Sequence, residues 1–325
     1  METVRYNAGF QGYFKVAAQT AQYVSPTTTS DPSVAAPTTI VGPCALPGWD
    51  INDNFRAVEG IGAGLDLGQV PGRRECSVRT RIDVANGDFL AYAIRNHTTP
   101  GTRATGWVNG MKLLTLGIGV GSQFADTDLH FVGPDALFQS LRMEIAENQT
   151  LTADVELWPI CIGEGTVVAT AAPTYTVPII WQSIAWTVGL EDLRPWLAGA
   201  SISVANTLER VGSRRQLTSG SPAAELAISR TASAIIPKLE KLTVQYRLHD
   251  DAPSTLRQTL APGIGTVVFY GEAPGAGAGR QTITLTISNN YLSRRAGQQA
   301  QANNILAYTA DTASHAIALT TGVTE

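Results

Sequence analysis

The residue types that most often carry chemistry are sparse in this chain and stand in no catalytic arrangement. The four histidines are His97, His130, His249 and His315. None has another His or a Cys at the spacing of a metal site, and the acidic pair that follows His249 fits a polar loop better than a catalytic cluster. No GxSxG nucleophile motif is present in the sequence. The sequence therefore predicts a protein that is not an enzyme.

Three glycine-rich runs raise the question of a phosphate-binding loop. They span residues 60–68, 117–121 and 275–279. Such a loop needs a strand before it and a helix after it, whereas a Pro-Gly pair follows the first run. The sequence has no GK[ST] motif, and no acidic segment has the glycine and closing glutamate of a calcium loop. We therefore expect neither a cofactor nor a bound metal ion.

Arginine supplies most of the positive charge and occurs in adjacent pairs near predicted turns. The pairs are Arg73 and Arg74, Arg214 and Arg215, and Arg294 and Arg295. Because guanidinium groups form forked hydrogen bonds to carboxylates and are favoured at interfaces, these six residues are candidates for contacts between subunits. The alternative is that they are solvated charges on loops.

The composition describes a globular chain with few charges. Its 325 residues are 44% hydrophobic and 15% charged, and the formal net charge is −4. A chain of this length can form two domains. The net negative charge argues against a protein that binds nucleic acid tightly. No apolar run approaches the roughly 18–20 residues of a membrane helix, and the first residues lack the pattern of a signal peptide. We expect no membrane partner, production in a cytosol, and three cysteines that are buried thiols.

The clearest element is a strand within residues 281–292. Ile283, Leu285 and Ile287 alternate there with hydroxyl-bearing residues, which are Thr282, Thr284, Thr286 and Ser288. Successive side chains of a strand point to opposite faces, so one face is aliphatic and the other is rich in hydroxyl groups.

Similar short patterns recur along the chain and predict a mainly β fold with few short helices. Strands are expected at 13–17, 76–84, 89–95, 113–120, 128–132, 141–146, 152–158, 179–188, 200–206, 227–229, 239–248, 266–270, 283–288 and 317–319. Short helical segments are expected at 134–141, after residue 221 and near 190–196, and 298–306 is expected to be a loop or a helix. Short strands separated by turn signals indicate a β-sandwich or barrel.

Four segments of the first half are echoed in the second half. The pairs are 82–86 with 202–206, 113–121 with 239–248, 131–133 with 269–271, and 141–148 with 283–290. They come in the same order in both halves, and loop insertions explain why their separation grows. The shared order predicts a duplicated β-domain in which the four pairs align.

These features divide the chain into four parts. An N-terminal strand with a Pro/Thr-rich arm or long loop covers 1–59, a first β-domain 60–162, a linker 163–178 and a second β-domain 179–325. The prolines within residues 19–48 exclude a regular element there. That segment is either a flexible loop or an extended arm that lies on a neighbouring subunit.

Two segments of the second half carry a resemblance to a known family. Pro178-Ile-Ile-Trp-Gln-Ser-Ile-Ala-Trp186, followed by Ser201-Ile-Ser-Val-Ala-Asn-Thr-Leu-Glu-Arg210, resembles the tail tube proteins of long-tailed bacteriophages. In many of them an alternating strand runs into an Asn-x-x-Glu-type turn before a second group of strands. The long strands that begin near residues 239 and 283 fall where that family has its tube-wall sheet.

The resemblance implies a structural protein of the virion, with no catalytic motif. Its fold would be a duplicated β-sandwich or barrel whose sheet joins neighbouring subunits into a ring, and three such chains would make a pseudo-hexameric ring. Stacked rings would form the tube through which DNA leaves the phage. The implied partners are further copies of the chain, other tail proteins, and DNA that passes without tight binding. The implied location is the phage tail, assembled in the bacterial cytoplasm.

Two other classes of protein remain open. One is another phage or virus structural protein, such as a decoration or minor capsid protein. The other is a non-catalytic carbohydrate-binding pair of β-sandwiches, which should display aromatic side chains on loops or on one exposed face. The tryptophans at 107, 158, 181, 186 and 196 mostly lie within apolar runs, which favours core positions.

A conduit must not retain the DNA that passes through it. Because each basic contact with DNA releases counterions and adds affinity, we expect a neutral or acidic channel surface. The candidates for this surface are Thr282, Thr284, Thr286 and Ser288, or Arg142, Glu144 and Glu147 in the corresponding segment of the first half. The alternative is that these polar side chains simply face outside solvent.

Overall fold

A computed structural model of the chain gives the positions of its strands and of the shorter connections between them. The residues that the structure describes are 13–19, 22, 39–40, 44–45, 47–59, 66–70, 72–85, 90–94, 107–108, 110–120, 129–164, 178–188, 191–212, 232, 234–249, 263–270, 280–299, 304–312 and 317–324.

The fold is mainly β, which confirms the prediction from the alternating patterns. The strands are β1 Tyr13–Ala18, β2 Thr39–Ile40, β3 Gly48–Asn52, β4 Arg56–Glu59, β5 Asp66–Val70, β6 Glu75–Asp83, β7 Trp107–Val108, β8 Met111–Lys112, β9 Leu114–Val120, β10 Leu129–Ala146, β11 Thr152–Trp158, β12 Gly163–Glu164, β13 Ile184–Val188, β14 Glu191–Asp192, β15 Leu197–Val211, β16 Ala234–His249, β17 Gly263–Tyr270, β18 Arg280–Gln299, β19 Asn304–Thr312 and β20 Ile317–Thr324. Three 3-10 turns accompany them in the described ranges: η2 Leu90–Ala93, η3 Trp181–Ser183 and η4 Arg194–Trp196.

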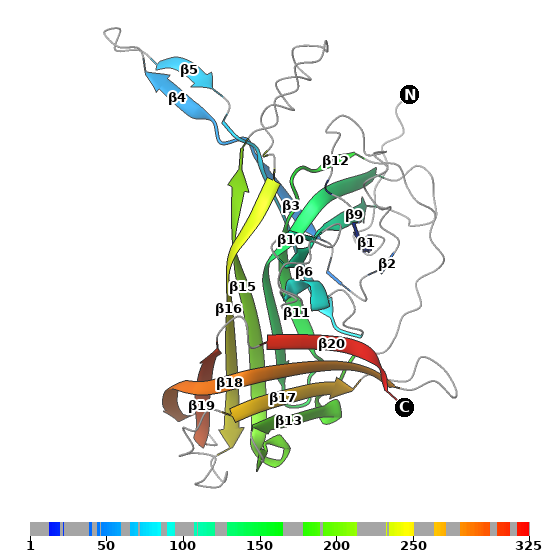
Figure 1. The fold of residues 1–325 in the computed structure, drawn as a ribbon, viewed down its shortest axis with the longest axis vertical. Coiled ribbons are helices and arrows are strands. Elements are labelled where there is room, and N and C mark those ends of the chain that lie inside the picture. The colour runs from blue at the N-terminus through cyan, green and yellow to red at the C-terminus, as the bar shows by residue number, and fades with distance from the viewer. Residues whose placement is uncertain are drawn as a thin grey trace.

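A long antiparallel sheet forms the centre of the molecule (Figure 1). Its strands follow the order β3, β6, β11, β10, β15, β16 and β19, and we call this the central sheet. Two smaller groups of strands extend from it. β2, β1, β9, β12 and the first half of β10 form the N-terminal cover sheet, and β14, β13, β17, β20 and the first half of β18 form the C-terminal cover sheet.

The apolar face of the central sheet is buried against both cover sheets. Trp49 of β3 contacts Phe131 of the N-terminal cover sheet, with ring centroids 4.7 Å apart. The ring of Trp186 in β13 packs against the ring of Tyr246 in β16, with ring centroids 5.8 Å apart. Ile283, which the sequence places on an aliphatic face, is 2% exposed in the same core. Burial of apolar surface between these layers is the main force that stabilises such a fold.

β10 passes from one sheet to the other, and this corrects the short helix predicted at 134–141. Its first half pairs with β9, its second half with β11 and β15, and the register shifts between Gly133 and Ala136. Asp135 has a positive φ of 51° at this point, which is the geometry of a bulge that bends a strand. Pro134 therefore marks a bend between two sheets, and not the first turn of a helix.

Other local predictions also need correction. Residues 89–95 were expected to form a strand, but 90–93 form the 3-10 turn η2. Residues 298–306, expected to be a loop or a helix, contain the end of β18 and the start of β19. The helical turn near residues 190–196 is confirmed by η4, whereas the segments at 221 and 227–229 lie outside the described residues.

The duplication predicted from the four echoed segments is not confirmed. Phe131 and Leu141 lie in one strand, β10, while their counterparts Phe269 and Ile283 lie in two strands, β17 and β18. The division into domains at 60–162 and 179–325 is crossed by the pairing of β10 with β15. The strands of both halves therefore share one sheet, and their pairing partners differ.

Candidate functional site

One face of the central sheet is polar on five adjacent strands, β6, β11, β10, β15 and β16, and we call it the polar face. Arg81, Asp154, Arg142, Ser203 and Thr243 lie side by side on five adjacent strands, from β6 to β16. Cross-strand neighbours of this kind are close enough for their side chains to interact. A parallel row one step along the strands contains Asp83, Thr152, Glu144, Ser201 and Gln245.

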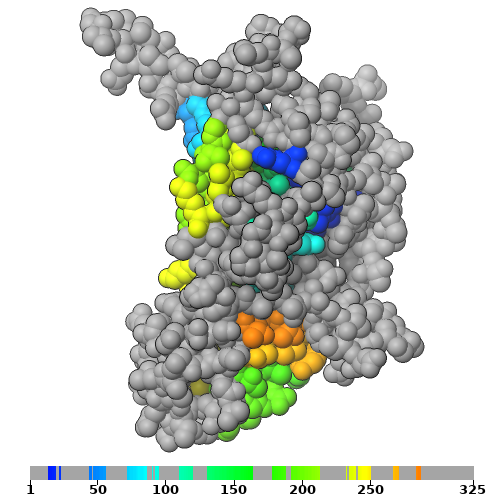
Figure 2. Space-filling view, viewed as in Figure 1, coloured from blue at the N-terminus to red at the C-terminus, as the bar shows by residue number. Residues whose placement is uncertain are grey.

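The charges of the polar face nearly balance. The described basic side chains are Arg79, Arg81, Arg142, Lys238, Lys241 and Arg247, and the acidic ones are Asp50, Glu75, Asp83, Glu144, Asp154, Glu156 and Glu209. Acidic groups thus exceed basic groups by one. In the view of Figure 2, described residues of β15 and β16 are visible at the left of the molecule, in green to yellow.

Four of the six basic groups of the polar face contact acidic or hydroxyl groups beside them; the fourth of these contacts joins Arg81 to Thr152. Arg79 donates a hydrogen bond to Glu156 with Nη2 and Oε1 3.1 Å apart. This hydrogen bond raises the pKa of the Arg79 guanidinium. Arg142 forms an ion pair with Glu144, and Lys238 forms one with Glu209. Exposed pairs of this kind add little stability, but they place a carboxylate beside three of the six positive charges.

Gly199 makes room for a further arginine on the polar face. A Cβ atom at this position would lie 2.8 Å from Nη2 of Arg247, on the neighbouring strand β16. The guanidinium of Arg247 therefore extends over the backbone of β15. The absence of a side chain at Gly199 lets the group lie close to the sheet.

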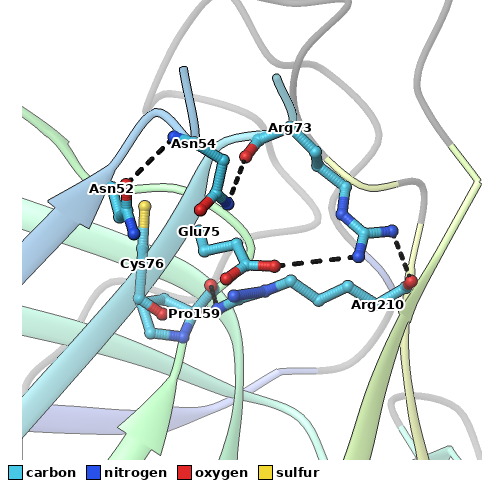
Figure 3. A network of polar contacts seen from close by, with 7 residues as sticks. All are labelled: Asn52, Asn54, Arg73, Glu75, Cys76, Pro159 and Arg210. Carbon is cyan, nitrogen blue, oxygen red and sulfur yellow. Dashed lines mark hydrogen bonds and ion pairs between the residues drawn. The ribbon is translucent and has the colours of Figure 1, made fainter. Parts of the chain in front are cut away.

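A second polar arrangement joins the ends of four chain segments beside the central sheet (Figure 3). Arg210 is 6% exposed, donates hydrogen bonds to the carbonyl oxygens of Cys76 and Pro159, and stacks over Trp158 with its Cζ atom 4.7 Å from the ring centroid. Burial lowers the pKa of the Arg210 guanidinium. Arg73 donates to the backbone oxygen of Arg210 at 2.6 Å. This arrangement fixes the far end of β15 to β6 and to the segment after β11.

The same arrangement continues into the base of the β4–β5 hairpin. Nδ2 of Asn54 donates to the backbone oxygen of Arg73 at 2.8 Å, and the Asn54 backbone has a positive φ of 44°. The backbone N–H of Asn54 donates a hydrogen bond to Oδ1 of Asn52, with N and Oδ1 2.9 Å apart. Arg74 forms a forked interaction with Asp53, with Nε and Oδ1 2.7 Å apart. Asn tolerates positive φ better than most residues because its short side chain bonds nearby backbone.

The predicted interface arginines have three different outcomes. Arg73 and Arg74 contact their own chain, as described above. Arg214 and Arg215 lie outside the described residues. The backbone of Arg294 and Arg295 lies in β18, opposite Thr309 and Tyr308. A role of these arginines between subunits stays a prediction.

The two candidate channel segments lie in different sheets. Arg142 and Glu144 belong to the polar face, and Glu147 is exposed just beyond β10, 3.8 Å from His249. Thr284 and Thr286 are half-buried in the C-terminal cover sheet, between β17 and β20. The backbone of Thr282 and Ser288 belongs to the same strand, and their side chains lie outside the description.

Sequence reasoning missed most of the polar face. Arg79 and Arg81 alternate with buried residues of β6, and Asp154 and Glu156 do the same in β11. That period of two was visible in the sequence and predicted the strands, but only the strand order reveals that these charges are neighbours. Asn206, assigned to a turn by the resemblance, instead lies within β15 and donates hydrogen bonds to the backbone oxygens of Ala93 and Phe138.

Several strands at the margins of the sheets have an edge that no other described strand pairs with. Among them are β3, which pairs with β6 alone, and β20, which pairs with β18 alone, in the described ranges. An open edge presents backbone N–H and C=O groups to which another chain can add a strand. These edges are therefore candidate subunit contacts.

The described residues offer little for other kinds of site. No group of three or more His, Cys, Asp or Glu side chains among them is arranged to hold a metal ion. None of the described helices is long and apolar enough to cross a lipid bilayer. Trp186 is buried, and Trp49, Trp158, Trp181 and Trp196 pack against the core. These tryptophans hold the layers together, as the apolar runs around several of them indicate.

Comparison with known proteins gives no family for the chain. No protein family model matches the sequence, and no curated protein matches it significantly.

Proposed function

We propose that the chain is a structural protein of a bacteriophage virion, a tail tube subunit that assembles into stacked rings around a DNA conduit. The observation that carries the proposal is the polar face, whose nearly balanced and partly paired charges suit a surface past which DNA slides. The resemblance of segments 178–186 and 201–210 of the chain to the tail tube family agrees with this role. The protein acts without catalysis in this proposal.

The electrostatic argument concerns affinity for DNA. Each lysine or arginine that neutralises a phosphate releases counterions and strengthens binding. On the polar face, Arg79, Arg142 and Lys238 already face carboxylates. A phosphate that approached one of them would compete with a neighbouring anion and meet the repulsion of the others. Such a surface is hydrated because its side chains are polar, but it binds DNA weakly.

The open sheet edges support assembly. β3 at one margin and β20 at another can each accept a strand of a neighbouring copy. A ring closes such edges by symmetry, and closed rings of identical chains are a common form of oligomer. We propose trimeric rings that stack, with other tail proteins bound at the ends of the tube.

Assembly of the purified chain tests this function. Light scattering and electron microscopy of the full chain at micromolar concentration, over a range of salt, should show rings or hollow tubes. Monomers under all of these conditions would contradict the proposal. Closed spheres would instead favour a capsid role.

Binding to DNA tests the conduit more narrowly. The wild-type chain should bind duplex DNA no more tightly than an unrelated acidic protein does. A variant with Glu144→Lys and Glu156→Lys reverses the charge balance of the polar face and should bind DNA, with an affinity that falls steeply as salt rises. Micromolar, salt-sensitive binding by the wild-type chain would exclude the conduit role and favour a DNA-binding or capsid protein.

A further inference from the structure

Two extensions, each of two strands, project from the same end of the central sheet (Figure 1). One is the β4–β5 hairpin, whose strands pair only with each other in the described ranges. The other comprises residues 206–211 of β15 and 234–241 of β16, and we call it the ribbon. β10 pairs with β15 only as far as Ala205, and β19 pairs with β16 only from Leu242. Because two strands alone are marginally stable in water, each extension depends on the contacts at its base.

Two buried side chains of β15 hold the base of the ribbon. Nδ2 of Asn206, which is 1% exposed, donates hydrogen bonds to two backbone oxygens at 3.1 and 3.0 Å. Nη2 of Arg210 donates to the backbone oxygens of Cys76 and Pro159, which belong to two other parts of the chain. The ribbon is therefore attached to the body of the molecule through acceptors that are far away in sequence.

A separate set of contacts holds the base of the β4–β5 hairpin. Arg74 forms two hydrogen bonds with Asp53, with Nε and Oδ1 2.7 Å apart. The N–H of Gly72 donates to the oxygens of Asp53 and Asn54, each 3.1 Å away. A Cβ atom at Gly72 would lie 2.3 Å from the backbone oxygen of Asn54. The chain segments that enter and leave the hairpin are therefore in direct contact.

Arg73 joins the two bases, and Figure 3 shows both of its hydrogen bonds. Its backbone oxygen accepts a hydrogen bond from Nδ2 of Asn54, at the base of the hairpin. Its Nη1 donates to the backbone oxygen of Arg210, in the ribbon, at 2.6 Å. The Arg73 guanidinium also lies 3.7 Å from Glu75, at the start of β6. One residue thus contacts the hairpin through its backbone and the ribbon through its side chain.

We propose that Arg73 couples the two extensions, so that loosening the base of one also loosens the other. Exposed segments with few partners open locally at a lower free energy than global unfolding requires. When the hairpin base opens, Arg73 loses its fixed position and the Arg210 oxygen loses its donor. The coupling is reciprocal by linkage, so a partner that orders one extension also orders the other. The inference concerns these contacts alone and does not rest on the tail tube role.

Hydrogen exchange of the full chain tests the coupling, with mass spectrometry of peptides from both extensions and all variants in the same state of assembly. Arg74→Met loosens the hairpin base without removing a contact of the ribbon, because Arg74 bonds to Asp53. Exchange should become faster in β4 and β5 and, to a smaller extent, in the ribbon. Arg73→Met removes the link, and exchange in the ribbon should rise about fivefold, the factor that one typical net hydrogen bond gives. In the double variant, Arg74→Met should add nothing further in the ribbon.

Arg194→Met is the matched control, because it removes an arginine from a similar forked pair, with Asp192, outside both extensions. It should leave exchange in both extensions unchanged. Peptides of β11 report global stability and should exchange as in the wild type in every variant. The proposal is overturned if Arg74→Met leaves the ribbon unchanged, if it accelerates the ribbon equally with and without Arg73, or if exchange rises evenly along the whole chain.

Discussion

The two faces of the central sheet are made from the same strands, yet different forces act on them. On β10, Leu141, Met143 and Ile145 are at most 4% exposed and pack between the layers, whereas Arg142 and Glu144 between them face the solvent. The apolar face stabilises the fold through burial. The polar face adds little stability because exposed ion pairs contribute little. Its near balance of charges is the property on which the proposed conduit role rests.

Neighbouring residues of β10 give the largest expected contrast. Met143→Ala removes a side chain that is 1% exposed and leaves a cavity, so we expect the free energy of unfolding to fall by about 2–5 kcal/mol. Arg142→Ala, one residue away on the polar face, should change it by about 0.5 kcal/mol or less. Urea denaturation of both variants measures the difference. Equal losses would show that the polar face also carries the stability of the fold.

Arg210 differs from most charged residues because its side chain is buried. A second pair of variants measures its contribution to the free energy of unfolding. Arg210→Met leaves the buried oxygens of Cys76 and Pro159 without their donor and should cost about 1–3 kcal/mol of unfolding free energy. Arg79→Met makes the same change at an exposed pair and should be close to neutral. If the two variants had the same stability, Arg210 would not be the link between β15 and β6 that the contacts indicate.

The smallest expected effect concerns an exposed ion pair outside both faces. The hydrogen bond from Arg194 holds the pKa of Asp192 below its ordinary value. A depressed pKa in the folded state gives a contribution to stability that is present above the pKa of the unfolded chain and is lost as the pH falls through the folded value. NMR titration of the Asp192 carboxyl should show the lowered pKa, and Arg194→Gln should return it towards the ordinary value. A titration that Arg194→Gln leaves unchanged would contradict this cause.

Local patterns predicted the strands well because a period of two is set by neighbouring residues. Burial of Ile283 and Leu285, with half-buried Thr284 between them, follows directly from their alternation. The bend at Pro134 could not be predicted in the same way. The first half of β10 belongs to one sheet and the second half to another, and only long-range strand pairing determines the sheet that each half joins. A proline after an apolar segment looks like the first turn of a helix until its pairing partners are known.

The candidate site was predicted only in part for the same reason. Arg142 and Glu144 were identified from their place in one segment, but their neighbours Asp154 and Ser203 lie on other strands. The echo between the halves is weak evidence for a duplicated domain, which the structure does not confirm, because similar alternation arises in any half-buried strand. The alternation in β15 places Arg210 in phase with the buried Val204 and Leu208, but its contacts could not be predicted, because its partners are backbone oxygens far away in sequence.

The orientation of the polar face in the assembled protein tests the central claim most directly. Electron cryomicroscopy of assemblies of the full chain should show hollow tubes whose channel is lined by the polar face, with Arg142 and Glu144 towards the axis. A channel of neutral or weakly acidic surface agrees with the account. Tubes with the polar face on the outside, or with a strongly basic channel, would contradict it.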